Sequence, residues 1–141
     1  MTTFSVKGAG PAPTLAEMQR VQSELGVRFN DEYRDFISRN NGGEVVGDHI
    51  FDIPPDNLSD VDGIIPLGRL AYQHSLFVDQ AGPDNIPIMF DSCGNQICMD
   101  MSGQNDGAIY FLEHEFPEPE ALTFLAPSLS AFLALVRPDD T

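Results

Sequence analysis

Two groups of carboxylates are the residues with the clearest chemical potential in this sequence. Closely spaced carboxylates can hold a cation, attract a basic protein, or simply form a solvated face that keeps the chain soluble. The first group lies in residues 48–62 and the second in residues 113–120. Their members are Asp48, Asp52, Asp56, Asp60 and Asp62 in the first group, and Glu113, Glu115, Glu118 and Glu120 in the second. The sequence leaves open whether either group is a binding surface or a solvated face.

A calcium loop is the most specific use that the first group suggests, because Asp60 and Asp62 precede Gly63 as in the middle of an EF-hand loop. Placing Gly63 at the sixth loop position puts Leu58 at the first position and Arg69 at the twelfth. A leucine and a cation therefore stand where the two most important carboxylates belong. We expect no EF-hand, no metal site and no cofactor.

The two cysteines, Cys93 and Cys98, are too few for a disulfide framework and for a zinc site that needs four ligands. Cys98 falls on a predicted core strand and Cys93 in a turn. A nucleophile at Cys93 that uses His49, His74 or His114 as its base stays open, because such partners meet only in the folded chain.

The net charge of −15 is distributed unevenly along the 141 residues. Residues 1–40 hold equal numbers of acidic and basic side chains, whereas only two of the seven basic residues, Arg69 and Arg137, lie in residues 41–141. Nucleic acids and anionic membranes are bound mainly through Lys and Arg, so neither is an expected partner, and a basic protein is favoured. No apolar run is long enough for a spanning helix and no signal-peptide pattern opens the chain, so we expect a cytoplasmic protein.

The elements that position these residues begin with two helices. Thr14 opens a capping-box pattern, and apolar residues then recur at helical spacing, which predicts a helix over 15–25. A second helix begins at Asn30 or Asp31 and ends at the Asn-Asn-Gly-Gly run of residues 40–43. Residues 1–13 are expected to be a lead-in segment, and residues 14–138 a single domain.

The rest of the chain has mainly strand periodicity. An added edge strand is expected around Phe4, residues 70–77 fit either a helix or a strand, and Ser128 caps a final helix that ends with Arg137 and Pro138. Gly and Asn between the strands favour an antiparallel meander. The predicted strands cover residues 44–46, 49–53, 86–91, 96–101 and 108–113. The predicted core includes Met18, Tyr33, Phe36, Phe90, Tyr110, Phe111 and Phe132.

The order of these motifs over residues 14–136 resembles the SUKH superfamily, which includes yeast cell-wall-assembly regulators and bacterial immunity proteins. The motifs that carry the resemblance are the Leu25-Gly26 helix end, the helix of residues 29–37, the Asn40-Asn41-Gly42-Gly43 stop, Ile64–Leu67, Ile86–Asp91, Gly94–Asp100, Gly107–Phe111 and the short C-terminal helix. The tryptophan typical of the family's strands is absent, which leaves the subfamily open.

The resemblance implies an α+β fold in which the N-terminal helix pair and the C-terminal helix pack on a curved antiparallel sheet. It also implies that the chain has no catalytic residues and neutralises a cognate toxin, often a nuclease, by protein–protein binding. Our leading hypothesis is a cytoplasmic bacterial immunity protein that binds a basic toxin through one of the two carboxylate groups. The alternative is a regulatory or scaffold module that binds a signalling or envelope-synthesis protein.

Overall fold

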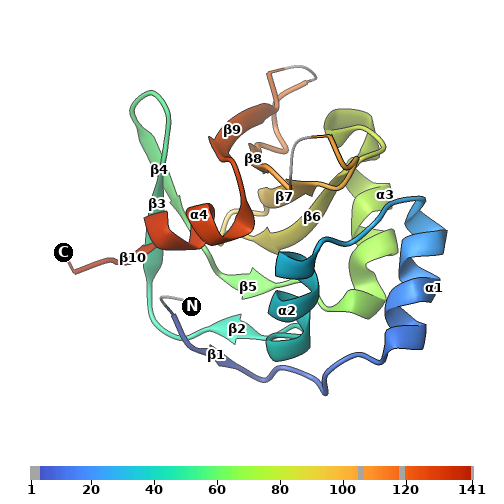
Figure 1. Cartoon of the computed structure of the whole chain (residues 1–141). Helices are drawn as coiled ribbons and strands as arrows, with labels where there is room; N and C mark the ends of the chain where they lie inside the picture. Colours follow the sequence, from blue (N-terminus) through green and yellow to red (C-terminus); the bar gives the residue numbers. More distant parts are fainter. Residues whose placement is uncertain (1–3, 105–106, 118–119, 141) are drawn as a thin grey trace.

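The computed structural model describes residues 4–104, 107–117 and 120–140. Two antiparallel sheets and the helices packed around them form the expected α+β fold (Figure 1). The larger sheet contains, in spatial order, β1 (Val6–Lys7), β2 (Glu44–Val45), β5 (Gly63–Ile64), β6 (Asn85–Phe90), β7 (Gln96–Asp100), β8 (Ile109–Leu112) and β9 (Leu122–Ala126). The smaller sheet contains β10 (Arg137–Pro138), β3 (His49–Ile53) and β4 (Asn57–Asp60).

The first two helices begin and end where the local sequence predicts. The helical elements are α1 (Leu15–Leu25), α2 (Asp31–Arg39), the 3₁₀ turn η1 (Leu67–Arg69), α3 (Leu70–Ala81) and α4 (Leu129–Leu135). Thr14 and Glu17 form the capping box of α1, and Asn30 accepts a hydrogen bond from the backbone N–H of Tyr33 at the start of α2. Gly26 ends α1 in the left-handed region, with φ 70°.

Three expectations about the elements need correction or completion. Residues 70–77 belong to a helix, α3, which extends to Ala81. The polar residues after the predicted strand 49–53 contain β4, and the chain after Glu120 contains β9, neither of which we predicted. Arg137 does not end the last helix, because Val136 already has extended backbone angles and Arg137 pairs with Ile50 in the smaller sheet.

The two sheets and α4 share one hydrophobic core. The Phe51 ring of β3 makes edge-on contacts with Phe111 of β8 at 6.0 Å and with Phe132 of α4 at 5.1 Å between ring centroids. Five of the seven predicted core residues are buried, whereas Phe90 and Tyr110 are only half-buried. These contacts hold the β3–β4 hairpin, which carries most of the first carboxylate group, against the larger sheet (Figure 1).

Candidate functional site

The first carboxylate group is divided by the β3–β4 hairpin into two places. Asp56 lies in the turn at the hairpin tip and Asp52 lies on β3 opposite Leu58, on an exposed stretch. Asp48, Asp60 and Asp62 lie at the base of the hairpin: Asp48 directly before β3, Asp60 at the end of β4, and Asp62 after it. The antiparallel pairing of β3 with β4 therefore brings residues separated by about a dozen positions in sequence to the same end of the hairpin.

The carboxylates at the hairpin base repel one another. The pKa of Asp62 lies above its usual value, first because partial burial disfavours the charged form and then because Asp60, Glu44, Asp91 and Asp48 add negative charge around it. We call the four outer members, Glu44, Asp48, Asp60 and Asp62, the base carboxylates. Among the described residues, Glu44 is the only base carboxylate that forms an ion pair, and its carboxylate lies 3.7 Å from the Lys7 amino group. The base carboxylates thus form a concentrated negative surface.

Asp91 is a buried residue that supports the candidate site, and our sequence reasoning did not single it out. It is only 2 % exposed, and its carboxylate accepts hydrogen bonds from the Ser59 hydroxyl at 2.6 Å, the Cys93 N–H at 2.9 Å, and the backbone and side-chain amides of Asn95 at 2.8 and 3.0 Å. An aspartate that opens a turn containing Gly and Asn, here three residues before Gly94, is typical of side chains that bind the turn's own backbone, and this signal was available in the sequence. Asp91 therefore joins β4 to the turn between β6 and β7.

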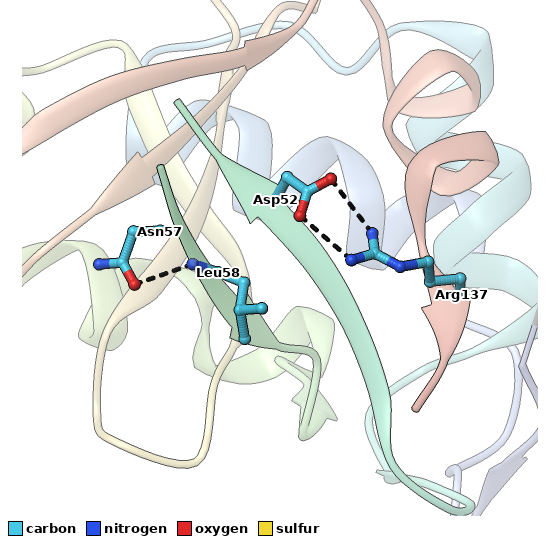
Figure 2. Close-up of polar contacts among 4 residues, drawn as sticks. All are labelled: Asp52, Asn57, Leu58 and Arg137. Atoms are coloured by element: carbon cyan, nitrogen blue, oxygen red, sulfur yellow. Dashed lines mark hydrogen bonds and ion pairs between the residues drawn. The ribbon is translucent and has the colours of Figure 1, made fainter. Parts of the chain in front are cut away.

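Asp52 is held by an intramolecular cation. The Arg137 guanidinium donates from two nitrogens to the two carboxylate oxygens of Asp52, at 3.1 and 3.3 Å (Figure 2). Paired guanidinium–carboxylate bonds fix the orientation of both groups, although this pair is open to solvent. Asp52 is therefore less available to a partner than the base carboxylates.

The second carboxylate group lies in the connection from β8 to β9. Glu113 is half-buried directly after β8, Glu115 and Glu120 are exposed, and Glu118 lies outside the described residues. The neighbouring His114 donates its backbone N–H to the Asn95 side chain at 3.0 Å, and its Nε2 lies 3.0 Å from the Cys93 carbonyl oxygen.

The turn between β6 and β7 links the two carboxylate groups. On its other side, Ser92 donates its N–H and its hydroxyl to Asp60, at 2.9 and 3.1 Å. The start of the β8–β9 connection and the hairpin base thus contact the same short turn of residues 91–95. The structure brings the near ends of the two groups to one end of the larger sheet, a proximity that their separation in sequence does not predict.

The cysteines and histidines do not assemble a recognisable reactive centre. The contact between His114 and Cys93 is made to the backbone carbonyl, while Nε2 of His74 faces the Gly82 carbonyl at 2.9 Å. Cys98 is buried on β7 as predicted, and burial raises the pKa of its thiol. Among the described parts of the chain, no three His, Cys, Asp or Glu side chains are arranged to hold a metal ion.

Comparison with known families identifies the fold. The SMI1/KNR4 family (SUKH-1) matches residues 12–135, which is nearly all of the chain. The protein belongs to this family. The match confirms the resemblance of the motif order, and it settles the subfamily that the missing tryptophan left open. A comparison with curated proteins found no match.

Membership of the SUKH-1 family indicates the general kind of partner that the protein has. Proteins of this family act in general by binding other proteins, and an immunity role is consistent with that. Across the residues described, no helix of this SUKH-1 protein is both long and apolar enough to cross a membrane. A protein is therefore the kind of partner that the family suggests for this candidate site.

Proposed function

We propose that this SUKH-1 protein is a cytoplasmic immunity protein that neutralises a cognate toxin with a basic surface, and that the toxin is a nuclease. The observation that carries the proposal is the concentration of negative charge at the hairpin base, where partial burial and, after it, the neighbouring carboxylates raise the pKa of Asp62. A folded protein maintains such repulsion at a cost to its own stability, and a cationic partner relieves it.

A nuclease fits this surface because it must carry Lys and Arg around its active site to hold phosphate. The base carboxylates offer an alternative set of anions to the same side chains. Their field accelerates the encounter with a basic partner, and close charge pairs then slow dissociation. Inhibition follows from occupying the basic surface, and it needs no catalytic group on the immunity protein.

Growth protection during co-expression with the toxin domain encoded by the adjacent gene tests the proposal. The wild-type protein should protect, and the triple variant Asp48→Asn, Asp60→Asn, Asp62→Asn should protect poorly. The matched control is Glu24→Gln, Asp31→Asn, Asp35→Asn, which removes the same number of charges from α1 and α2, where each carboxylate already faces an arginine. This control should protect fully.

Three other outcomes would refute or change the proposed function. Full protection by the triple variant would refute the role of the base carboxylates, and loss of protection on neutralising Glu113, Glu115, Glu118 and Glu120 instead would move the surface to the second group. If no adjacent toxin exists and a pull-down returns a signalling or envelope-synthesis protein, the proposal is refuted and the regulatory or scaffold role takes its place.

A further inference from the structure

The four outer strands of the two sheets differ in how they are protected against pairing with another chain. An unprotected edge strand offers free N–H and C=O groups, and natural proteins normally block it with short length, charge, proline or side-chain caps. β1 is two residues long and carries Lys7. β10 is equally short and contains Pro138, which has no N–H to offer. The next residue, Asp139, donates its N–H to the Asp48 carbonyl, so the backbone nitrogen of Pro138 lies on the outer side of β10, away from β3.

β4 is protected by a side chain. The Val61 N–H donates to the His49 carbonyl, so alternation along the ladder directs the Leu58 N–H away from β3. The side-chain oxygen of Asn57 accepts that N–H at 2.8 Å (Figure 2). A strand approaching β4 from outside therefore finds this donor already occupied.

β9 has none of these protections. Its five residues, Leu122–Ala126, include no charge and no proline. The Glu113 N–H donates to the Ala121 carbonyl, so Ala121 belongs to a hydrogen-bonded pair between β8 and β9. Because such pairs alternate along an antiparallel ladder, the N–H groups of Leu122 and Phe124 point away from β8. Within the part of the chain that the structure describes, these outward groups have no recorded hydrogen-bond partner. The register irregularity of this ladder falls after Phe124 and leaves Leu122–Phe124 in regular pairing.

A groove of about 490 Å³ lies between β9 and the hairpin. Its apolar walls include Leu125 of β9, Leu135 of α4 and Leu58 of β4, and the last two are each 53 % exposed. The charged residues that line it are Asp52 and Asp56, both acidic. Asp56 has no ion-pair partner among the described residues. On the opposite face of β9 from Leu125, the Phe124 ring is half exposed and contacts Tyr110 edge-on.

We infer that β9 is a docking edge that takes up an extended segment of a partner protein in which basic and large apolar residues alternate. The segment adds to the sheet through the outward amides of Leu122 and Phe124. Alternate side chains of a strand point to opposite faces, so its apolar residues contact the exposed Phe124 ring. Its Lys or Arg residues lay their aliphatic stems along Leu125 and Leu135 and direct their charges to Asp56. The inference rests on the proposed function, because it assigns the basic partner a second point of contact.

A second copy of this chain fits the edge poorly. Each copy carries a net charge of −15, and pairing two β9 strands would bring two acidic grooves together. A basic segment instead gains both the backbone hydrogen bonds and the attraction of the carboxylates, which is why we assign the edge to it.

Amide exchange measured by NMR on the full ¹⁵N-labelled chain tests the inference. The probe is a capped seven-residue peptide of alternating lysine and valine, and the control peptide alternates glutamate and valine. With the lysine peptide at ten times its dissociation constant, the Leu122 and Phe124 amides should exchange about elevenfold more slowly, because only the free fraction of the protein exchanges. The glutamate peptide should leave both rates unchanged.

Two variants at one position separate the backbone from the side chain. Phe124→Ala removes the ring but keeps the outward N–H, whereas Phe124→Pro removes both, a change that an edge position tolerates. The proline variant should bind the lysine peptide about tenfold more weakly than the alanine variant. Should Phe124→Pro not fold, Asp56→Asn supplies the test, with an expected loss of about threefold in affinity for the lysine peptide.

Several results would overturn the inference. If the lysine peptide leaves the exchange of Leu122 and Phe124 unchanged and shifts only the resonances of Asp48, Asp60 and Asp62, the docking edge is refuted while the proposed function stands. Equal protection by the glutamate peptide would refute the basic occupant. Protection that grows with protein concentration alone would assign the edge to a second copy. Peptide docking on β9 without growth protection against the toxin would instead refute the proposed function.

Discussion

Replacing Asp91 should destabilise the fold more than the loss of any other single carboxylate in the two groups or their surroundings. Its buried carboxylate accepts four hydrogen bonds from Ser59, Cys93 and Asn95. A hydrogen bond to a charged group contributes about 1.5–3 kcal/mol, and hydration of the opened turn returns part of the sum. We therefore expect Asp91→Ala to lower the free energy of unfolding by about 3 kcal/mol. Asp91→Asn, which keeps the shape without the charge, should cost about half as much.

Thermal unfolding followed by circular dichroism measures this effect. An unfolding entropy of about 2.1 cal/mol/K per residue gives ~0.3 kcal/mol/K for 141 residues, so 3 kcal/mol corresponds to a fall of about 10 °C in Tm. Asp79→Ala, at an exposed position of α3, is the control and should change Tm by less than about 2 °C. A fall for Asp91→Ala no larger than that of the control would refute the reasoning that Asp91 joins the hairpin to the turn.

Three further changes have defined outcomes. Asp62→Asn should raise Tm at pH 7 by about 1 °C, the scale of a screened surface charge, because the raised pKa of Asp62 means that its charged form destabilises the folded state. The gain should shrink as the pH falls through that pKa, and a loss of stability at pH 7 would contradict it. A double-mutant cycle of Asp52→Ala with Arg137→Ala should give a coupling of about 0.5–1 kcal/mol in urea unfolding, and zero coupling would show that the pair seen in Figure 2 does not act in solution. Gly63→Ala should cost about 1–3 kcal/mol, because the added Cβ collides with the Phe90 ring, and Phe90→Leu should recover part of that cost.

The sequence predicted those elements whose signals are local. The Thr14 capping box and the Asn30 cap act within one helical turn, so both helices begin where their sequence indicates. The strands β6, β7 and β8 are mostly buried runs between Gly and Asn turns, and they lie within about one residue of the predicted bounds.

The elements that the sequence did not predict depend on pairing with distant segments. β4 is polar and is a strand because its backbone pairs with β3, and Arg137 leaves the final helix to pair with β3 as well. β9 is short and follows a loop, so it has little periodicity of its own.

The candidate site was predictable in composition but not in arrangement. Counting carboxylates found both groups, yet only the fold shows that Asp52 is paired with Arg137 while Asp60 and Asp62 share the hairpin base with Glu44. The sequence placed Asp91, which supports that base, at the end of a predicted strand. Its role could not be predicted, because burial of a carboxylate depends on donors from other segments, here Ser59 of β4.

The association rate of the complex with the toxin domain, measured by stopped flow at increasing NaCl, tests the central claim most directly. If the base carboxylates steer a basic partner, the wild-type rate constant falls steeply with salt. The triple variant Asp48→Asn, Asp60→Asn, Asp62→Asn should then associate about tenfold more slowly at low salt, with a flatter salt dependence. The variant Glu24→Gln, Asp31→Asn, Asp35→Asn should behave like wild type. Equal rates and equal salt slopes for the two variants would contradict a binding surface at the hairpin base.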